Sequence, residues 1–214
     1  MKMILFSGRR KDKSKTSFIS LIKKYKLLTL IALLLLSGMI FGTFCVGFAE
    51  ENTIESLDFL FASNFKVRSQ QSLFEIFSTS LTSSFVFVAL MTLLGLSVWG
   101  VLAIPIVPFF RGFGLGLTAG FLYSNYGIKG FLYHLIVLLP GVIISSVAIL
   151  IHARESLVFS ARLMSKILPK GNIDRLWERT KLYFLRTGYV LIILAASSLV
   201  DMLFTMLFSG YFNF

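Results

Sequence analysis

The sequence predicts an all-α, polytopic integral membrane protein with five transmembrane helices, the third of them short and glycine-rich, and short amphipathic helices at the membrane surface. Only 14% of its 214 residues are charged, and 56% are apolar. Ordinary soluble domains carry about 25% charge. Long apolar stretches recur along the chain, and most of the basic residues lie at their ends. A water-soluble domain is therefore excluded, and a disulfide scaffold is excluded because Cys45 is the only cysteine.

Five stretches are predicted to cross the membrane. A helix needs about 20 apolar residues to cross a hydrocarbon layer about 30 Å thick. Four stretches reach or approach that length, at about residues 27–48, 85–109, 130–151 and 188–208. The remaining span, 112–126, is too short to cross untilted without flanking residues, and a re-entrant loop is the alternative. A cleaved signal peptide is the alternative for the first span, but its apolar run is longer than such signals have.

The basic residues predict how the chain is oriented. It divides into a basic arm (1–26), a single membrane domain (27–208) and a tail (209–214). Nine of the 21 Lys and Arg residues lie in the arm, and eight more lie within residues 152–187. Short connecting segments rich in Lys and Arg stay in the cytoplasm. We therefore expect the N-terminus and the inner segment 152–187 inside the cell, with the outer loop 49–84 and the C-terminus outside.

The polar segments are expected to lie against the bilayer. Binding of the arm to an anionic leaflet accounts for the net charge of +11. No nucleic-acid partner is expected, because no aromatic platform or recognition-helix pattern accompanies the charge. Apolar residues recur at helical spacing over residues 53–83 and 154–187, the second interrupted at 169–172 (PKGN). This spacing predicts a pair of interfacial helices on each side, and docking of a cytosolic partner on the inner pair is an alternative role.

Two spans carry glycines at helical spacing. Gly38 and Gly42 lie four residues apart in the first span, and Gly112, Gly116 and Gly120 repeat the spacing in the third. In lipid, such a face lets the backbone of a neighbouring helix approach closely. We expect these glycines to pack helices within the same chain, and a homo-oligomer formed through a second copy is the alternative.

Prolines and one arginine predict irregular helix ends. Pro105 and Pro108 precede Arg111, which suggests a broken helix end at the inner interface whose freed carbonyls accept hydrogen bonds from the guanidinium. Snorkelling of Arg111 to the surface is the alternative. Pro140 lies in the fourth span and predicts a kink there.

Asp201 is the only acidic residue well inside a span, so it should be neutral or paired. Its candidate partners are Arg111, His134 and backbone donors freed by a kink. The sequence shows no second membrane aspartate, no phosphate-binding loop and no His, Cys or carboxylate cluster, since His134 and His152 stand apart. We expect no enzymatic activity, metal or cofactor. The alternatives are a permease or ion-conducting subunit, which Asp201 and the kink motivate, and a membrane subunit that serves a separate ATPase.

Three motifs carry a resemblance to a known family. Residues 38–44 (GMIFGTF) close the first span, residues 96–108 lead into 111–121 (RGFGLGLTAGF), and residues 126–140 follow. With this hydropathy plan, the sequence resembles the stage II sporulation protein M family. The resemblance implies a non-enzymatic membrane component of the engulfment complex in endospore-forming bacteria. It also implies a scaffold that holds two peptidoglycan-degrading partners, stage II sporulation proteins D and P, at the septal or engulfing membrane.

Overall fold

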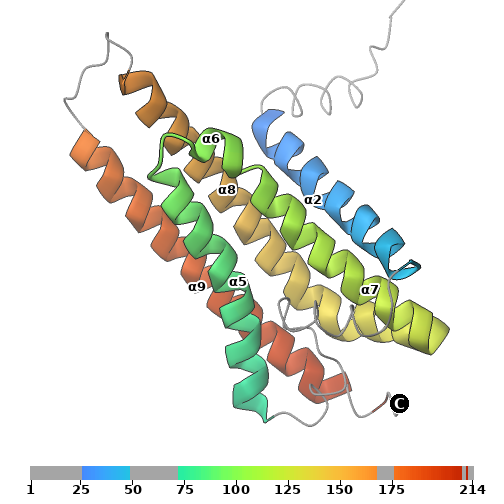
Figure 1. Ribbon diagram of the computed structural model, residues 1–214. Coiled ribbons are helices and arrows are strands. Elements are labelled where there is room, and N and C mark those ends of the chain that lie inside the picture. Colours follow the sequence, from blue (N-terminus) through green and yellow to red (C-terminus); the bar gives the residue numbers. More distant parts are fainter. Residues whose placement is uncertain (1–25, 49–71, 168–175, 209–210, 212–214) are drawn as a thin grey trace, which may run out of the picture.

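The computed structural model describes residues 26–48, 72–167, 176–208 and 211, and these are almost entirely helical (Figure 1). The elements are α2 (Lys26–Val46), α5 (Leu73–Gly95), α6 (Gly100–Ala103), α7 (Ile106–Tyr133), the π-helical turn η1 (His134–Leu138), α8 (Leu139–Ile167) and α9 (Leu176–Phe208). No strand occurs among the described residues, so the prediction of an all-α fold is confirmed. The predicted basic arm apart from Lys26, the first part of the outer loop, the 169–172 break and most of the tail lie outside the described residues.

Four helical stretches are long and apolar enough to cross a membrane: Lys26–Val46, Leu73–Gly95, Gly100–Ser165 and Trp177–Phe208. The third is too long for one crossing, and the chain turns back within it at Gly127. A Cβ on Gly130 would lie 2.0 Å from the carbonyl oxygen of Leu122, whereas eight residues of straight helix span about 12 Å. The stretch thus contains two arms that run in opposite directions (Figure 1). Five crossings remain a prediction, which this hairpin supports.

The second span differs from its predicted range, 85–109, at both ends. Helix α5 starts earlier because Ser72 and Glu75 form a capping box: the Ser72 N–H donates to the Glu75 carboxylate at 2.8 Å, and Ser72 Oγ accepts from the Glu75 N–H at 3.4 Å. The helix also ends earlier, in a turn where Ser160 of α8 donates to the carbonyl of Ser97 at 2.6 Å. The end of the predicted range belongs to α7. The sequence prediction merged the end of α5 and the start of α7 into one span, because the turn between these helices is also largely apolar.

The third span is longer than the predicted 112–126. Helix α7 begins at Ile106, with Pro105 at its N-cap and Pro108 in its first turn, where a backbone N–H has no partner within the helix. From there to the turn at Gly127, the helix covers about 30 Å, enough to cross a hydrocarbon layer. Its length therefore no longer argues for a re-entrant loop.

Gly127 supplies the backbone conformation of this turn, with φ 56° and ψ −136°, a region that residues with a Cβ rarely adopt. We expect Gly127→Ala to lower the free energy of unfolding by about 1–3 kcal/mol, although a Cβ there would meet no atom within 4 Å. Gly188→Ala is the matched control, since its surroundings are equally open but its backbone is helical. Thermal denaturation in detergent measures both variants, and equal midpoints would contradict this account.

The inner segment 152–187 does not form separate helices on the membrane surface. Helix α8 continues from the membrane domain to Ile167, and α9 starts at Leu176. The two extensions pack on each other, with the rings of Phe159 and Tyr183 stacked 4.6 Å apart. Phe159 and Tyr183 therefore face the partner helix. The second half of the predicted outer amphipathic pair is likewise the first part of α5.

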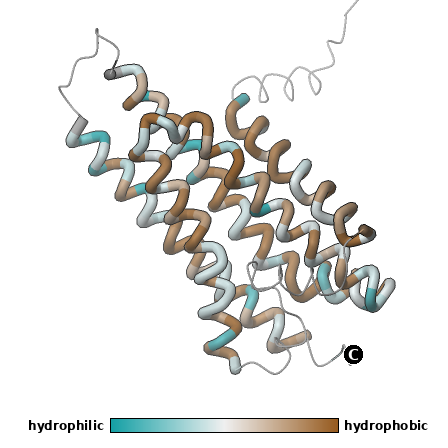
Figure 2. Tube along the Cα trace, viewed as in Figure 1, coloured by the Kyte–Doolittle hydropathy of each residue, from teal (hydrophilic) through white to brown (hydrophobic). Residues whose placement is uncertain are grey.

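One apolar core joins all the long helices. It contains Ile31 of α2, Met91 of α5, Ile149 of α8 and Leu194 of α9, each fully buried. The outward faces are apolar as well, and Figure 2 shows hydrophobic colouring along most of each helix, with hydrophilic segments near the upper ends of α8 and α9. Such an exterior suits lipid, because helices that are apolar all round are stable only when water is excluded from every face.

Candidate functional site

The five glycines predicted to pack helices meet in one interface, here termed the glycine interface. Its members are Gly38 and Gly42 of α2 and Gly112, Gly116 and Gly120 of α7. A Cβ on Gly38 would lie 2.1 Å from the carbonyl oxygen of Phe109, and one on Gly42 would lie 2.2 Å from that of Phe113. These distances leave no room for any side chain, so the backbones themselves are in contact.

The contact is reciprocal along α7. A Cβ on Gly112 would lie 2.0 Å from the carbonyl oxygen of Leu35, and one on Gly116 would lie 2.1 Å from that of Met39. Gly120 is less tightly packed, since its closest neighbour, Val46 Cγ2, would be 3.0 Å away. The helix that packs on the α7 glycines is thus α2 of the same chain.

A polar cluster lies deeper in the bundle, around Arg111. This side chain is only 6% exposed, and its guanidinium donates to Ser83 at 3.1 Å and Ser84 at 3.3 Å on α5 and to Ser145 at 3.5 Å on α8. Its Cζ lies 5.3 Å from the ring centroid of Phe87. The predicted role of Arg111 at a broken helix end is therefore wrong. The break lies before α7, and Arg111 lies inside the continuous helix.

Asp201 of α9 belongs to the same cluster. It is 5% exposed and interacts electrostatically with Arg111, one of its three predicted partners. Its side chain packs on the backbone of α8, where a Cβ on Gly141 would lie 2.7 Å from the Asp201 Cβ. Ser197, one turn earlier on α9, donates to the Gly141 carbonyl at 2.7 Å. Arg111 and Asp201 thus link α7 to α9 in the interior, with serines of α5 and α8 around them.

The irregularity predicted at Pro140 takes the form of a wider helical turn. Pro140 has no N–H to donate, and the π-helical turn η1 precedes it, with the Leu139 N–H bonded to the carbonyl of His134. His134 itself is buried, at 6% exposure.

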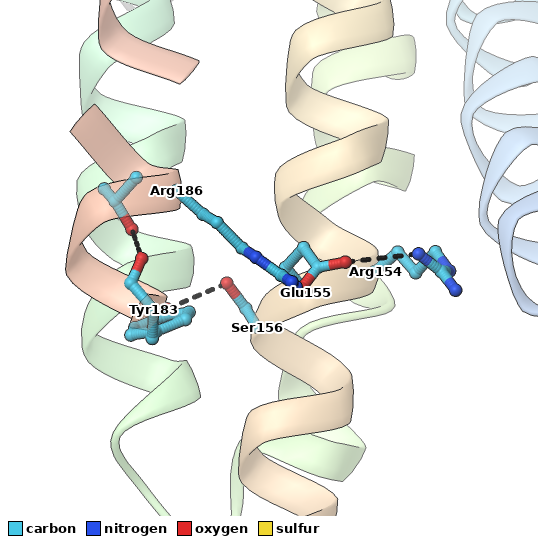
Figure 3. Close-up of polar contacts among 6 residues, drawn as sticks. Arg154, Glu155, Ser156, Tyr183 and Arg186 are labelled. Atoms are coloured by element: carbon cyan, nitrogen blue, oxygen red, sulfur yellow. Dashed lines mark hydrogen bonds and ion pairs between the residues drawn. The ribbon is translucent and has the colours of Figure 1, made fainter. Parts of the chain in front are cut away.

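A second polar network, absent from the sequence prediction, connects α5, α8 and α9. The hydroxyls of Ser156 and Tyr183 are 2.9 Å apart (Figure 3). His152 Nε2 lies 2.9 Å from Thr92 Oγ1, and the Tyr183 hydroxyl also donates to the Thr92 carbonyl at 3.3 Å. Sequence spacing offered one signal, because His152 and Ser156 lie four residues apart on a helix. Ser156 Oγ is 3.4 Å from His152 Nε2, but Ser156 is fully buried. This Ser–His contact is therefore closed to any substrate.

Tyr183→Phe is expected to lower the free energy of unfolding by about 0.5–1.5 kcal/mol, because it removes the hydroxyl that bonds both the buried Ser156 side chain and the Thr92 carbonyl. The control is Tyr189→Phe on the same helix, whose side chain is 67% exposed and should tolerate the change. Denaturation midpoints of the purified variants test the difference. A loss of equal size in both variants would show that the network contributes nothing.

These features define the class of protein. It is an α-helical, multi-pass membrane protein in which the backbones of α2 and α7 are in contact and a polar cluster is buried among the helices. Over the described residues, no group of three His, Cys, Asp or Glu side chains is placed to hold a metal. The chain belongs to the stage II sporulation protein M family, whose model matches residues 30–206 and so includes the glycine interface, Arg111 and Asp201. No curated protein and no solved structure matches it.

Proposed function

We propose that this protein is a non-enzymatic membrane scaffold that recruits and holds peptidoglycan-degrading enzymes, stage II sporulation proteins D and P, at the septal membrane during engulfment. The observation that carries the proposal is the family match, which runs from α2 almost to the end of α9. Family membership suggests a sporulation-related membrane protein, and the resemblance of the sequence motifs extends this to the engulfment complex.

The structure is compatible with a holding role. The buried polar groups around Arg111 and His152 are bonded mainly to one another, so they connect helices. The cavity between α8 and α9 touches neither His152 nor Ser156. A bundle whose helices are joined by buried hydrogen bonds suits a protein that positions others.

Localisation in sporulating cells tests the scaffold role. In a spore-forming strain that encodes this protein, deletion of its gene should disperse fluorescent fusions of proteins D and P from the septum. Restoring the wild-type gene, or the Gly188→Ala variant, should return them. Septal enrichment of both fusions in the deletion strain, at the wild-type level, would contradict the proposal.

The proposed orientation places the N-terminus and the α8–α9 connection in the cytoplasm and the Gly127 turn and the C-terminus outside. Support comes from the basic residues. Lys26 begins α2, and Arg154 and Arg186 lie in the halves of α8 and α9 next to their connection. These three helix ends lie toward the same end of the bundle (Figure 1). Single cysteines introduced into a Cys45→Ser background at Asn172 and Lys129 test it. A membrane-impermeant thiol reagent should label Lys129→Cys in intact cells and leave Asn172→Cys unlabelled; the reverse labelling would overturn the orientation.

A permease or ion-conducting subunit is the second candidate, because Arg111 and Asp201 are both buried inside the membrane domain and interact electrostatically, and ionisable residues there commonly mark ion pathways. Proteoliposomes that contain the purified chain should then show ion or solute flux that Asp201→Asn abolishes. Absence of flux above protein-free vesicles would remove this candidate.

A further inference from the structure

A groove of about 260 Å³ lies between α8 and α9, near the end of the bundle where the two helices carry their basic residues. Stacked aromatic rings, Phe159 and Tyr183, form part of its lining. Charged side chains from both helices surround these rings. Figure 3 shows Glu155 of α8 lying toward Arg186 of α9, beside Tyr183. The groove is thus an apolar surface with a charged margin.

The charges of the margin are not balanced. Glu155 accepts from Arg154 at 3.1 Å and also from Arg186, so its own charge is already paired. Arg162 of α8 and Arg179 of α9 also line the groove. Neither makes an ion pair with any other residue that the structure describes. Two exposed guanidinium groups, on facing helices, therefore border the same groove.

One acidic group opposes them. Glu178 lines the groove as well, next to Arg179 in the chain, and the structure pairs it with no described cation. After the Glu155 pairing, the margin thus retains two arginines against one glutamate. The balance favours an anionic ligand, and Glu178 limits how tightly that ligand binds.

The groove lies at the boundary between the apolar and the charged parts of the bundle. The Tyr183 hydroxyl donates to the Thr92 carbonyl, and a Cβ on Gly95 would lie 2.4 Å from that hydroxyl, so the groove is level with the end of α5. The apolar run of α9 begins just beyond, at Gly188, and that of α8 ends at Ile151. Phosphate groups of a bilayer lie at such a boundary.

We propose that this groove binds the headgroup phosphate of an anionic phospholipid, with Arg162 and Arg179 as its donors. Guanidinium groups offer paired N–H donors that match phosphate oxygens, and basic pockets between transmembrane helices suit anionic headgroups. Leu182, 53% exposed, and Val158 line the same groove and provide an apolar wall for the first part of an acyl chain. This wall favours a lipid over a soluble phosphate.

Native mass spectrometry of the full chain in detergent measures the binding. The probes are phosphatidylglycerol and phosphatidylcholine with identical acyl chains, so that only the headgroup charge differs. We expect at least threefold more bound phosphatidylglycerol than phosphatidylcholine, and loss of that preference in the Arg162→Gln/Arg179→Gln variant. Lys26→Gln/Lys181→Gln also removes two charges, at residues that neither line the groove nor form an ion pair with a described lining residue, and should keep the preference.

A variant that is expected to bind more lipid separates loss of binding from loss of the fold, because a misfolded protein would not gain binding. Glu178→Gln removes the opposing charge and should raise phosphatidylglycerol retention about twofold or more. Equal loss in the two double variants would overturn the proposal, because general surface charge would then explain binding. Competition by millimolar inorganic phosphate that removes all bound lipid would overturn the choice of a lipid, as would unchanged retention in Glu178→Gln. The outcome is independent of the scaffold role, which localisation tests separately.

Discussion

Gly116→Ala is expected to destabilise the protein by about 1–3 kcal/mol, and Gly116→Val by more, because overpacked contacts must be relieved by moving backbone. A Cβ there would lie 2.1 Å from the Met39 carbonyl oxygen and 3.0 Å from its Cα. These are main-chain atoms, which cannot rotate away as a side chain does. The two helices must therefore separate along the whole interface, and neighbouring close contacts at Gly112 and Gly42 are lost together.

Chemical denaturation in mixed micelles measures these losses. Gly47→Ala is the matched control at the end of α2, since its Cβ would make only an ordinary contact, 3.5 Å from the Phe44 carbonyl oxygen. Combining Gly42→Ala with Gly116→Ala should cost less than the sum of the two single changes, because helices already separated by one methyl group make room for the other. Two results would contradict an interface in which the backbones are in contact: a double-variant loss of stability equal to the sum of the single losses, or a loss in Gly47→Ala as large as that in Gly116→Ala.

The second large effect is expected at the Arg111–Asp201 pair. Asp201→Asn keeps the shape that packs on Gly141 but removes the charge, and the guanidinium is then left buried without its counter-charge. Losing this electrostatic interaction between two buried groups is expected to cost about 0.5–3 kcal/mol. Part of this loss will be offset, because Ser83, Ser84 and Ser145 still accept from Arg111.

A double-mutant cycle isolates the interaction. Arg111→Met/Asp201→Asn should be more stable than the sum of the two single losses predicts, with a coupling of about 1–3 kcal/mol, since neither charge remains buried alone. Arg186→Gln serves as the control, because this ion-paired residue is 59% exposed at the bundle end and should cost under about 1 kcal/mol. Zero coupling would show that the two charges do not stabilise each other.

Apolar composition located the membrane helices but did not locate where each helix begins and ends. The unbroken apolar character of residues 85–109 hid a turn and the start of α7, since lipid and protein interior both accept apolar side chains. A local polar signal was available in Ser72 and Glu75, whose spacing marks the start of α5. Charged residues after Ile151 suggested surface helices, although α8 continues through them by packing on α9.

Some residues of the polar clusters could be recognised from the sequence, and others could not. Asp201 and Arg111 are recognisable from the sequence because charge inside an apolar span is costly. Their serine partners are not, since Ser83, Ser84 and Ser145 stand among many serines that would be tolerated anywhere in a membrane helix. The Tyr183 network depends on three helices meeting at one level, which no local pattern encodes.

The sequence by itself determined that this is an all-helical membrane protein and where its glycine faces lie, because both follow from composition or from spacing along one helix. Its motifs also resembled the family to which the family match assigns it. Tertiary structure alone decided that α2 is the helix packed on the α7 glycines, that Arg111 points into the interior, and that two arginines border one groove. These three features depend on which helices are neighbours and on how far each helix is shifted along the bundle axis relative to the others. Many arrangements of apolar helices satisfy the same hydropathy, and only close packing of specific side chains selects one.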